Sequence, residues 1–159
     1  MNRIGIIGAM DEEVDILVEL MDIKETIEKA SLKFYKGTLE GKDIVLVRCG
    51  IGKVNSALCA QILISEFDVD AIVNTGVAGA LHSELDVLDM VISTDAIQYD
   101  VDTTAFGDPK GTIPRMESSV FVADEKLINA AYESSIKEMK SNKVLKGRVA
   151  TGDIFISSK

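Results

Sequence analysis

Tryptophan is absent from this chain of 159 residues, which also has only two prolines, two cysteines and one histidine. The cysteines, Cys49 and Cys59, lack CxxC spacing and have apolar neighbours, so we expect buried free thiols rather than a disulfide. No Cys/His ligand spacing exists, and the sequence therefore predicts no metal site. The single histidine, His82, stands in the loop-like stretch "GALHSEL", where we expect it to be solvated.

Positive charge is also scarce, because 17 Lys and Arg residues face 26 Asp and Glu residues, for a net charge of -9. This balance argues against sequence-independent binding of nucleic acid, which depends on neutralising phosphates. The N-terminus shows no signal-peptide pattern, and the longest apolar runs have the length of strands, so we expect a cytoplasmic protein without a membrane partner. The length fits about one domain with an adequate core.

Apolar periodicity predicts alternating strands and helices. The first half is expected to hold a buried strand over 3–8, a helix capped by Asp11 and a hairpin of strands 33–39 and 44–49. A helix over 53–67 and a buried strand in "DAIVNTG" follow. The second half is expected to contain a strand in 86–94, a helix over 124–140 and a strand in 143–153. That helix should turn five side chains inward: Leu127, Ile128, Ala131, Ile136 and Met139.

This order of elements favours an α/β fold in which helices flank a layered mixed sheet with an inserted antiparallel hairpin. We expect residues 1–159 to form a single α/β domain. The stretch 98–116 holds both prolines and little periodicity, which predicts a long and functional loop. Because "TGDIFISSK" ends just after a strand and a glycine turn, we expect the C-terminal part of the fold to be absent.

Three glycine-bearing segments each follow a predicted strand: "GAMDEE", "CGIGK" and "NTGVAG". Ligands of open α/β sheets bind beyond the carboxyl ends of the strands, so we expect these segments to meet at one edge. A P-loop is excluded because Val54 follows Gly52-Lys53, and a dinucleotide fingerprint because Asn55 stands where a small residue is required.

The acids after Gly8 also make a phosphate site improbable. Two like unit charges about 4 Å apart cost around 4 kcal/mol at an effective dielectric near 20. Water is therefore the more natural co-substrate. Taken alone, however, Asp11, Glu12 and Glu13 are better explained as acids favoured in the first turn of a helix than as catalytic groups.

Five motifs stand in the order and spacing of one family: "IGIIGAMDEEV", "CGIGKVNSA", "IVNTGVAGAL", "DTTAFG" and "TGDIFI". The chain thereby resembles the first two-thirds of the bacterial 5′-methylthioadenosine/S-adenosylhomocysteine nucleosidases, within the nucleoside phosphorylase superfamily. The resemblance implies a homodimer that hydrolyses the N-glycosidic bond of these thionucleosides to adenine and a thioribose. It implies no cofactor.

The resemblance also implies roles for individual positions. Glu13 matches the carboxylate that activates the attacking water. Met10 and Ile51 match the lining of the ribose and thioalkyl region, and Val77, Ala78 and Gly79 match the loop beside the ribose. Phe155 and Ile156 match the adenine site, and three positions match contacts across the dimer into the partner's thioalkyl pocket: Thr103, Phe106 and Pro114.

Two departures accompany the match, because members of the family usually have Ser at the position of Val77 and Gly at that of Ala80. The family's acid, an Asp in a Ser-Asp pair, and its ribose-binding Glu, in a Met-Glu pair, lie downstream of Lys159. We therefore expect negligible activity from residues 1–159 alone. A nucleoside phosphorylase, a futalosine-type hydrolase and a nucleoside-binding or structural fragment remain as alternatives.

Overall fold

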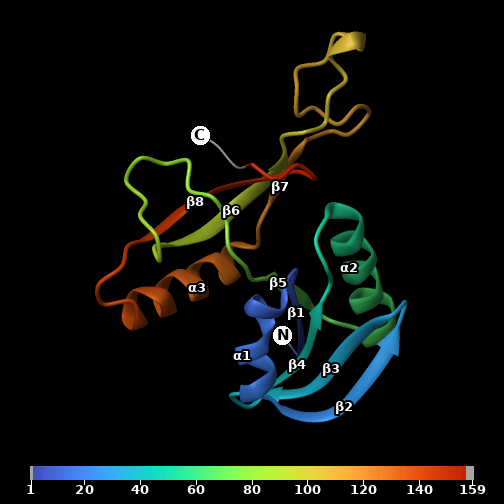
Figure 1. Cartoon of the computed structure of the whole chain (residues 1–159), viewed down its shortest axis with the longest axis vertical. Coiled ribbons are helices and arrows are strands. Elements are labelled where there is room, and N and C mark those ends of the chain that lie inside the picture. The colour runs from blue at the N-terminus through green and yellow to red at the C-terminus, as the bar shows by residue number, and fades with distance from the viewer. Residues whose placement is uncertain (1, 157–159) are drawn as a thin grey trace. The chain divides into compact units, whose positions relative to one another are not determined.

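The computed structural model describes residues 2–156, which form two compact units that divide between Ala78 and Gly79 (Figure 1). The first unit contains five strands, β1 (Arg3–Gly8), β2 (Asp22–Lys29), β3 (Leu32–Leu39), β4 (Lys42–Arg48) and β5 (Ala71–Asn74), and two helices, α1 (Asp11–Leu20) and α2 (Lys53–Phe67). The second contains strands β6 (Met90–Gln98), β7 (Val120–Val122) and β8 (Val144–Thr151), helix α3 (Glu125–Glu138) and the short 3-10 helix η1 (Thr104–Phe106).

The sheet of the first unit is mixed, with strand order β2-β3-β4-β1-β5. Strand β1 pairs in parallel with both β4 and β5, whereas β2, β3 and β4 form an antiparallel meander. This confirms the predicted α/β fold class and the hairpin of β3 and β4.

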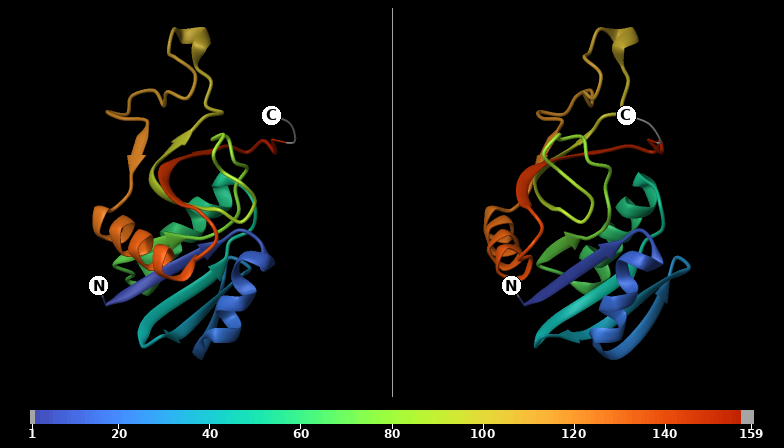
Figure 2. Two further views of the ribbon diagram at one scale, coloured as in Figure 1. Left: turned by 90° about the vertical axis from the view of Figure 1, so that its left-hand side faces the viewer. Right: turned by 60° about the vertical axis from the view of Figure 1, so that its left-hand side comes forward.

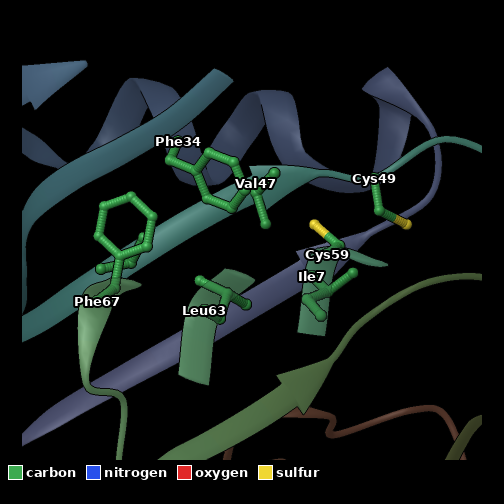
Figure 3. Packing of buried hydrophobic residues seen from close by; sticks show 8 residues of the cluster. Ile7, Phe34, Val47, Cys49, Cys59, Leu63 and Phe67 are labelled. Carbon is green, nitrogen blue, oxygen red and sulfur yellow. The ribbon is translucent and has the colours of Figure 1, made fainter. Parts of the chain in front are cut away.

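Helices α1 and α2 cover opposite faces of this sheet. The residues of β4 show this arrangement, since alternate side chains of a strand point to opposite faces. Val45 and Val47 pack with α2, and Ile44 and Leu46 pack with α1. On the α2 face, the ring of Phe34 stacks on that of Phe67 with centroids 5.0 Å apart (Figure 3). The expectation that the first strand is buried between two layers is thus confirmed.

The second unit has a three-stranded sheet of order β7-β6-β8, in which β8 is parallel and β7 antiparallel to β6. Helix α3 packs on β6 and β8. The loop between β6 and β7 extends away from this sheet in both views of Figure 2. Apart from η1 it contains no helix or strand, as predicted for 98–116.

Several predicted details are wrong. Met10, not Asp11, caps α1, and Asp11 begins the helix and pairs with Arg48 instead. Ala131 and Ile136 are exposed on α3 rather than inward, because the described part of the second unit offers that side no packing layer. The strand expected in 86–94 begins only at Met90 and continues to Gln98.

Two strands were not predicted. Strand β2, "DIKETIEK", carries many charges and is mostly exposed, and it forms through antiparallel pairing with β3 at the edge of the sheet rather than through burial. Strand β7 has only three residues, too few to show a period. Conversely, the prediction of a helix over 53–67 matches α2 at both ends.

Candidate active site

The three glycine-bearing segments, the third of them as far as Ala78, meet at one edge of the sheet of the first unit. Strands β4, β1 and β5 are adjacent and parallel, so their carboxyl ends coincide. The backbone N–H of Cys49 donates to the carbonyl of Gly8 at 2.9 Å, and that of Thr75 donates to the carbonyl of Ile7 at 2.9 Å. The segments after the strands are thereby fastened side by side, as the sequence predicted.

The carboxylate of Glu13 is the polar group held at this edge. Its Oε2 accepts the backbone N–H of Ala9 at 2.7 Å and that of Met10 at 3.2 Å. Its Oε1 accepts the backbone N–H of Val77 at 3.0 Å. Two segments more than 60 positions apart in the sequence thus bind one carboxylate. The structure brings together three of the predicted site residues, Met10, Glu13 and Val77.

The local sequence explains why Glu13, and not its acidic neighbours, takes this place. Glu13 is the third residue of α1, from which a side chain reaches back to the N–H groups at the start of the helix. Asp11 points instead to Arg48, with 2.9 Å between Oδ1 and Nε. Glu12 is exposed, whereas Glu13 is half-buried.

The side chain at position 77 takes no part in the contact with Glu13. Val77 donates through its backbone N–H, and its side chain is 80% exposed. The hydrogen bond is therefore independent of whether the residue is Val or Ser.

The segment between β4 and α2 supplies the third loop of this edge. Gly50 and Gly52 have φ angles of 82° and 107°, which residues with a side chain rarely adopt. The amide nitrogen of Asn55 donates to the carbonyl of Ile51 at 2.7 Å, which fixes the turn. Ile51 itself is 74% exposed, so an apolar side chain is presented beside the sheet edge rather than buried in the core.

In the second unit, Phe155 and Ile156 follow β8 and are 90% and 60% exposed. The stretch before them is attached to the end of β6. The hydroxyl of Tyr99 donates to the carbonyl of Ile154 at 3.1 Å, and the backbone N–H of Asp153 donates to Asp100 at 2.9 Å. The backbone is therefore held while the ring of Phe155 stays open to solvent.

Three further predicted residues lie in the long loop of the second unit. The η1 turn begins after Thr103 and ends at Phe106, whose ring is 88% exposed. Asp102 holds this turn, because its carboxylate accepts the backbone N–H of Thr104 at 3.1 Å and the hydroxyl of Thr104 at 2.7 Å. Pro114 is exposed farther along the loop. The loop thus presents an aromatic ring on an ordered turn.

The two cysteines and the histidine lie as expected. Cys49 and Cys59 are buried free thiols, and burial raises the pKa of Cys59 to about 12, with the neighbouring Cys49 adding to the effect. His82 is exposed. Within residues 2–156, no group of three or more His, Cys, Asp or Glu side chains could hold a metal ion, and no helix of that part is long and apolar enough to cross a membrane.

Sequence reasoning missed the residues that surround Glu13. Gly8 and Gly76 approach its side chain closely, and Ala9 supplies the shortest hydrogen bond to it. The available signal was a glycine at or just after the end of each of two predicted strands, a position where backbone can approach another group. The prediction that the second of these strands, β5, is buried is wrong, because β5 lies at the edge of its sheet and Val73 is 38% exposed.

Comparison with known proteins shows the family of this chain. A sequence profile of the phosphorylase superfamily matches residues 3–159. The 5′-methylthioadenosine/S-adenosylhomocysteine nucleosidase of Anoxybacillus flavithermus is 46% identical over 97% of this chain and 66% of its own length. The corresponding protein of Pseudoalteromonas translucida is 45% identical, again over 97% of this chain and 65% of its own. The chain thus spans just under two thirds of the length of these relatives.

Solved structures give the same result. The nucleosidase of Neisseria meningitidis in complex with methylthio-immucillin-A superposes with a TM-score of 0.92 at 37% identity, over 99% of this chain and 68% of that one. Futalosine hydrolase of Helicobacter pylori superposes with a TM-score of 0.89 at 34% identity, over 99% of this chain and 67% of that one. The chain belongs to the phosphorylase superfamily and, within it, to the family of 5′-methylthioadenosine/S-adenosylhomocysteine nucleosidases.

Proposed function

We propose that the protein to which this chain belongs hydrolyses the N-glycosidic bond of 5′-methylthioadenosine and S-adenosylhomocysteine, releasing adenine and a thioribose without a cofactor. The observation that carries the proposal is the Glu13 carboxylate, fixed at the sheet edge by N–H groups of Ala9, Met10 and Val77. Membership of the nucleosidase family supports the choice of substrate.

A fixed carboxylate suits this reaction for two reasons. Cleavage of an N-glycosidic bond develops positive charge on the ribosyl group, and a preorganised negative charge stabilises it. The same carboxylate can accept a proton from the attacking water, and general-base catalysis of this kind contributes roughly 10²–10⁴-fold. We assign Glu13 both roles.

Membership of the family supports roles for the other predicted residues, each within its own unit. Met10 and Ile51 would line the ribose and thioalkyl region, and Val77, Ala78 and Gly79 would lie beside the ribose. Phe155 would stack on adenine, whose edge would bind the backbone of Ile156. In a cytoplasmic homodimer, the exposed Phe106, with Thr103 and Pro114, would enter the partner's thioalkyl pocket. Residues 1–159 would then function as one α/β domain.

Two other enzymes of the superfamily are alternatives. A nucleoside phosphorylase is disfavoured because a phosphate near Glu13 would meet a like charge, at a cost of around 4 kcal/mol at about 4 Å. A futalosine hydrolase is favoured by one specific observation, the similarity to the enzyme of Helicobacter pylori. A nucleoside-binding or structural fragment is the non-enzymatic alternative.

The test is adenine release by the product of the complete gene, followed by chromatography with methylthioadenosine, adenosylhomocysteine and futalosine in separate reactions. We expect turnover of the two thionucleosides in phosphate-free buffer. A strict need for phosphate, or turnover of futalosine alone, would overturn the proposal.

The Glu13→Gln variant should lose turnover by at least about 10²-fold while still binding adenine, because it keeps the side-chain size and removes the base. Glu12→Gln is the matched control, since Glu12 is exposed on the same turn of helix. Residues 1–159 assayed alone test the expectation that this segment has negligible activity.

A further inference from the structure

The backbone of Gly76 lies directly against the carboxylate of Glu13. A Cβ atom built on Gly76 would lie 2.5 Å from Oε1, 2.9 Å from Cδ and 3.1 Å from Oε2 of Glu13. The φ angle of Gly76 is not in the left-handed region, so alanine could adopt this backbone. A side chain at position 76 would therefore displace the Glu13 carboxylate from the space that it occupies, whereas the backbone conformation alone would permit alanine.

Gly8 limits the same side chain from its other end. A Cβ on Gly8 would lie 3.1 Å from Cβ of Glu13 and 2.6 Å from Cγ1 of Val14. The φ angle of Gly8 is likewise outside the left-handed region. The stem of Glu13 thus packs against one glycine and its carboxylate against another, which leaves the side chain little freedom to rotate.

The two carboxylate oxygens are not equivalent. Each has two lone pairs. Among residues 2–156, Oε2 accepts two N–H groups, from Ala9 and Met10, whereas Oε1 accepts one, from Val77. Oε2 is saturated by these bonds, and Oε1 keeps capacity for one more donor.

We propose that Gly76 is a positioning residue for Glu13, which together with Gly8 confines the carboxylate so that Oε2 is its anchor and Oε1 faces the attacking water. This inference rests on the proposed hydrolysis for the identity of the donor at Oε1. The confinement of Glu13 does not depend on that reaction and can be tested without it.

The first experiment measures amide chemical shifts by NMR in the 159-residue chain. Glu13→Gln should move the amide protons of Ala9 and Met10 to higher field, because it replaces a charged acceptor by a neutral one. Gly76→Ala should move the same two protons, although residue 76 is distant from both in the sequence. The Val77 amide is not diagnostic, because it adjoins the substitution.

Gly147→Ala is the matched control, since a Cβ there would have an ordinary contact of 3.7 Å with Val91 and the φ angle is not left-handed. It should leave the Ala9 and Met10 protons unmoved. If Gly76→Ala also leaves them unmoved, the inference is overturned.

The second experiment tests whether the effect of Gly76→Ala requires the Glu13 side chain. Gly76→Ala should lower the urea midpoint in the wild-type background but not in a Glu13→Ala background, where the colliding atoms are gone. This comparison stays decisive if Gly76→Ala alone does not fold, because Glu13→Ala/Gly76→Ala should then fold. Equal destabilisation in both backgrounds contradicts the inference.

The third experiment uses the product of the complete gene. Gly76→Ala should lower kcat by about 10²-fold with little change in KM, since a small misplacement of a reacting group has an effect of that size. In a Glu13→Asp background, whose shorter side chain retracts the carboxylate, Gly76→Ala should add little further loss. An unchanged kcat in Gly76→Ala overturns the assignment of Gly76 as a positioning residue. Absence of turnover in the wild type overturns the proposed function instead. In that case the NMR and urea experiments still test the assignment of Gly76.

Discussion

Both units contain a mixed sheet, but the two sheets are buried to different extents. Within the described residues, every buried hydrophobic side chain belongs to the first unit, where α1 and α2 cover both faces of the sheet. In the second unit α3 packs on β6 and β8. The large apolar side chains of this unit are half-buried or exposed; Val122 of β7 is 81% exposed, and Ile136 of α3 is 50% exposed. The first unit therefore has its own hydrophobic core, and it is also the unit that fixes Glu13.

The largest expected difference between the units is in thiol reactivity. With its pKa raised to about 12, Cys59 has a thiolate fraction near pH 8 of about 10⁻⁴, roughly 10³-fold below that of a thiol at the ordinary value of 9.0. In a Val122→Cys variant, the exposed new thiol should react with maleimide at least about 10³-fold faster than Cys59. Peptide mapping by mass spectrometry measures both rates, and comparable rates would show that the core of the first unit opens readily.

The second-largest expected difference between the units is the loss of stability when a large apolar side chain is truncated. Leu63 is fully buried in the first unit, so Leu63→Ala should lower the free energy of unfolding by about 2–5 kcal/mol. Ile136→Ala, on the exposed side of α3, should lower it by less than about 1 kcal/mol. Urea denaturation followed by circular dichroism measures both. Equal losses would mean that Ile136 is covered in solution.

Hydrogen exchange sharpens the comparison strand by strand. Amides of β4, which is central in its sheet and carries four consecutive buried residues, should exchange about 10²-fold more slowly than those of β6, which is central in the other. NMR or mass spectrometry after transfer to D₂O gives the rates. Similar protection in β4 and β6 would contradict the view that only the first unit has a core of its own.

The smallest expected effect is electrostatic. The backbone N–H groups of Arg3 and Asn2 hold the pKa of Asp70 below its usual value, and the Arg148 guanidinium does the same for Asp95 of the second unit. A lowered folded-state pKa stabilises the protein above the unfolded value and loses this effect as the pH falls through the folded value. Asp70→Asn and Asp95→Asn should therefore each destabilise slightly at neutral pH, and the difference from wild type should vanish at strongly acidic pH. Urea midpoints across pH 2–7 test this.

The same contrast explains which elements were predictable from sequence. Strand β1 and helix α2 are fixed by local apolar runs and glycines, and their predicted bounds match. Strand β2 has no apolar pattern to reveal it, because it is held by a neighbour in the sheet. The inward face assigned to α3 was wrong at Ile136, since a period shows which residues align but not whether anything covers them.

The candidate site was likewise only partly predictable from the sequence. An acid after the first strand and glycines after three strands were visible in the sequence, and their meeting at one edge followed from parallel strands. The bonds from Ala9 and Met10 are those that a Glu at the third position of a helix can accept. The bond from Val77 could not be predicted, because its donor is a backbone N–H more than 60 positions away. That Gly76 abuts the carboxylate likewise depends on a distance that only the folded chain defines.

Neighbouring positions 76 and 77 consequently differ in how freely they can change during evolution. At position 76 any side chain would enter the volume of the Glu13 carboxylate, so a substitution there displaces that carboxylate. At 77 the contact comes from the backbone and the side chain points to solvent, so a Ser codon can become a Val codon while the hydrogen bond to Glu13 is inherited intact. A carboxylate that is held by backbone N–H groups can thus keep its position while the side chains around it diverge. The same backbone arrangement can then be retained when the substrate changes.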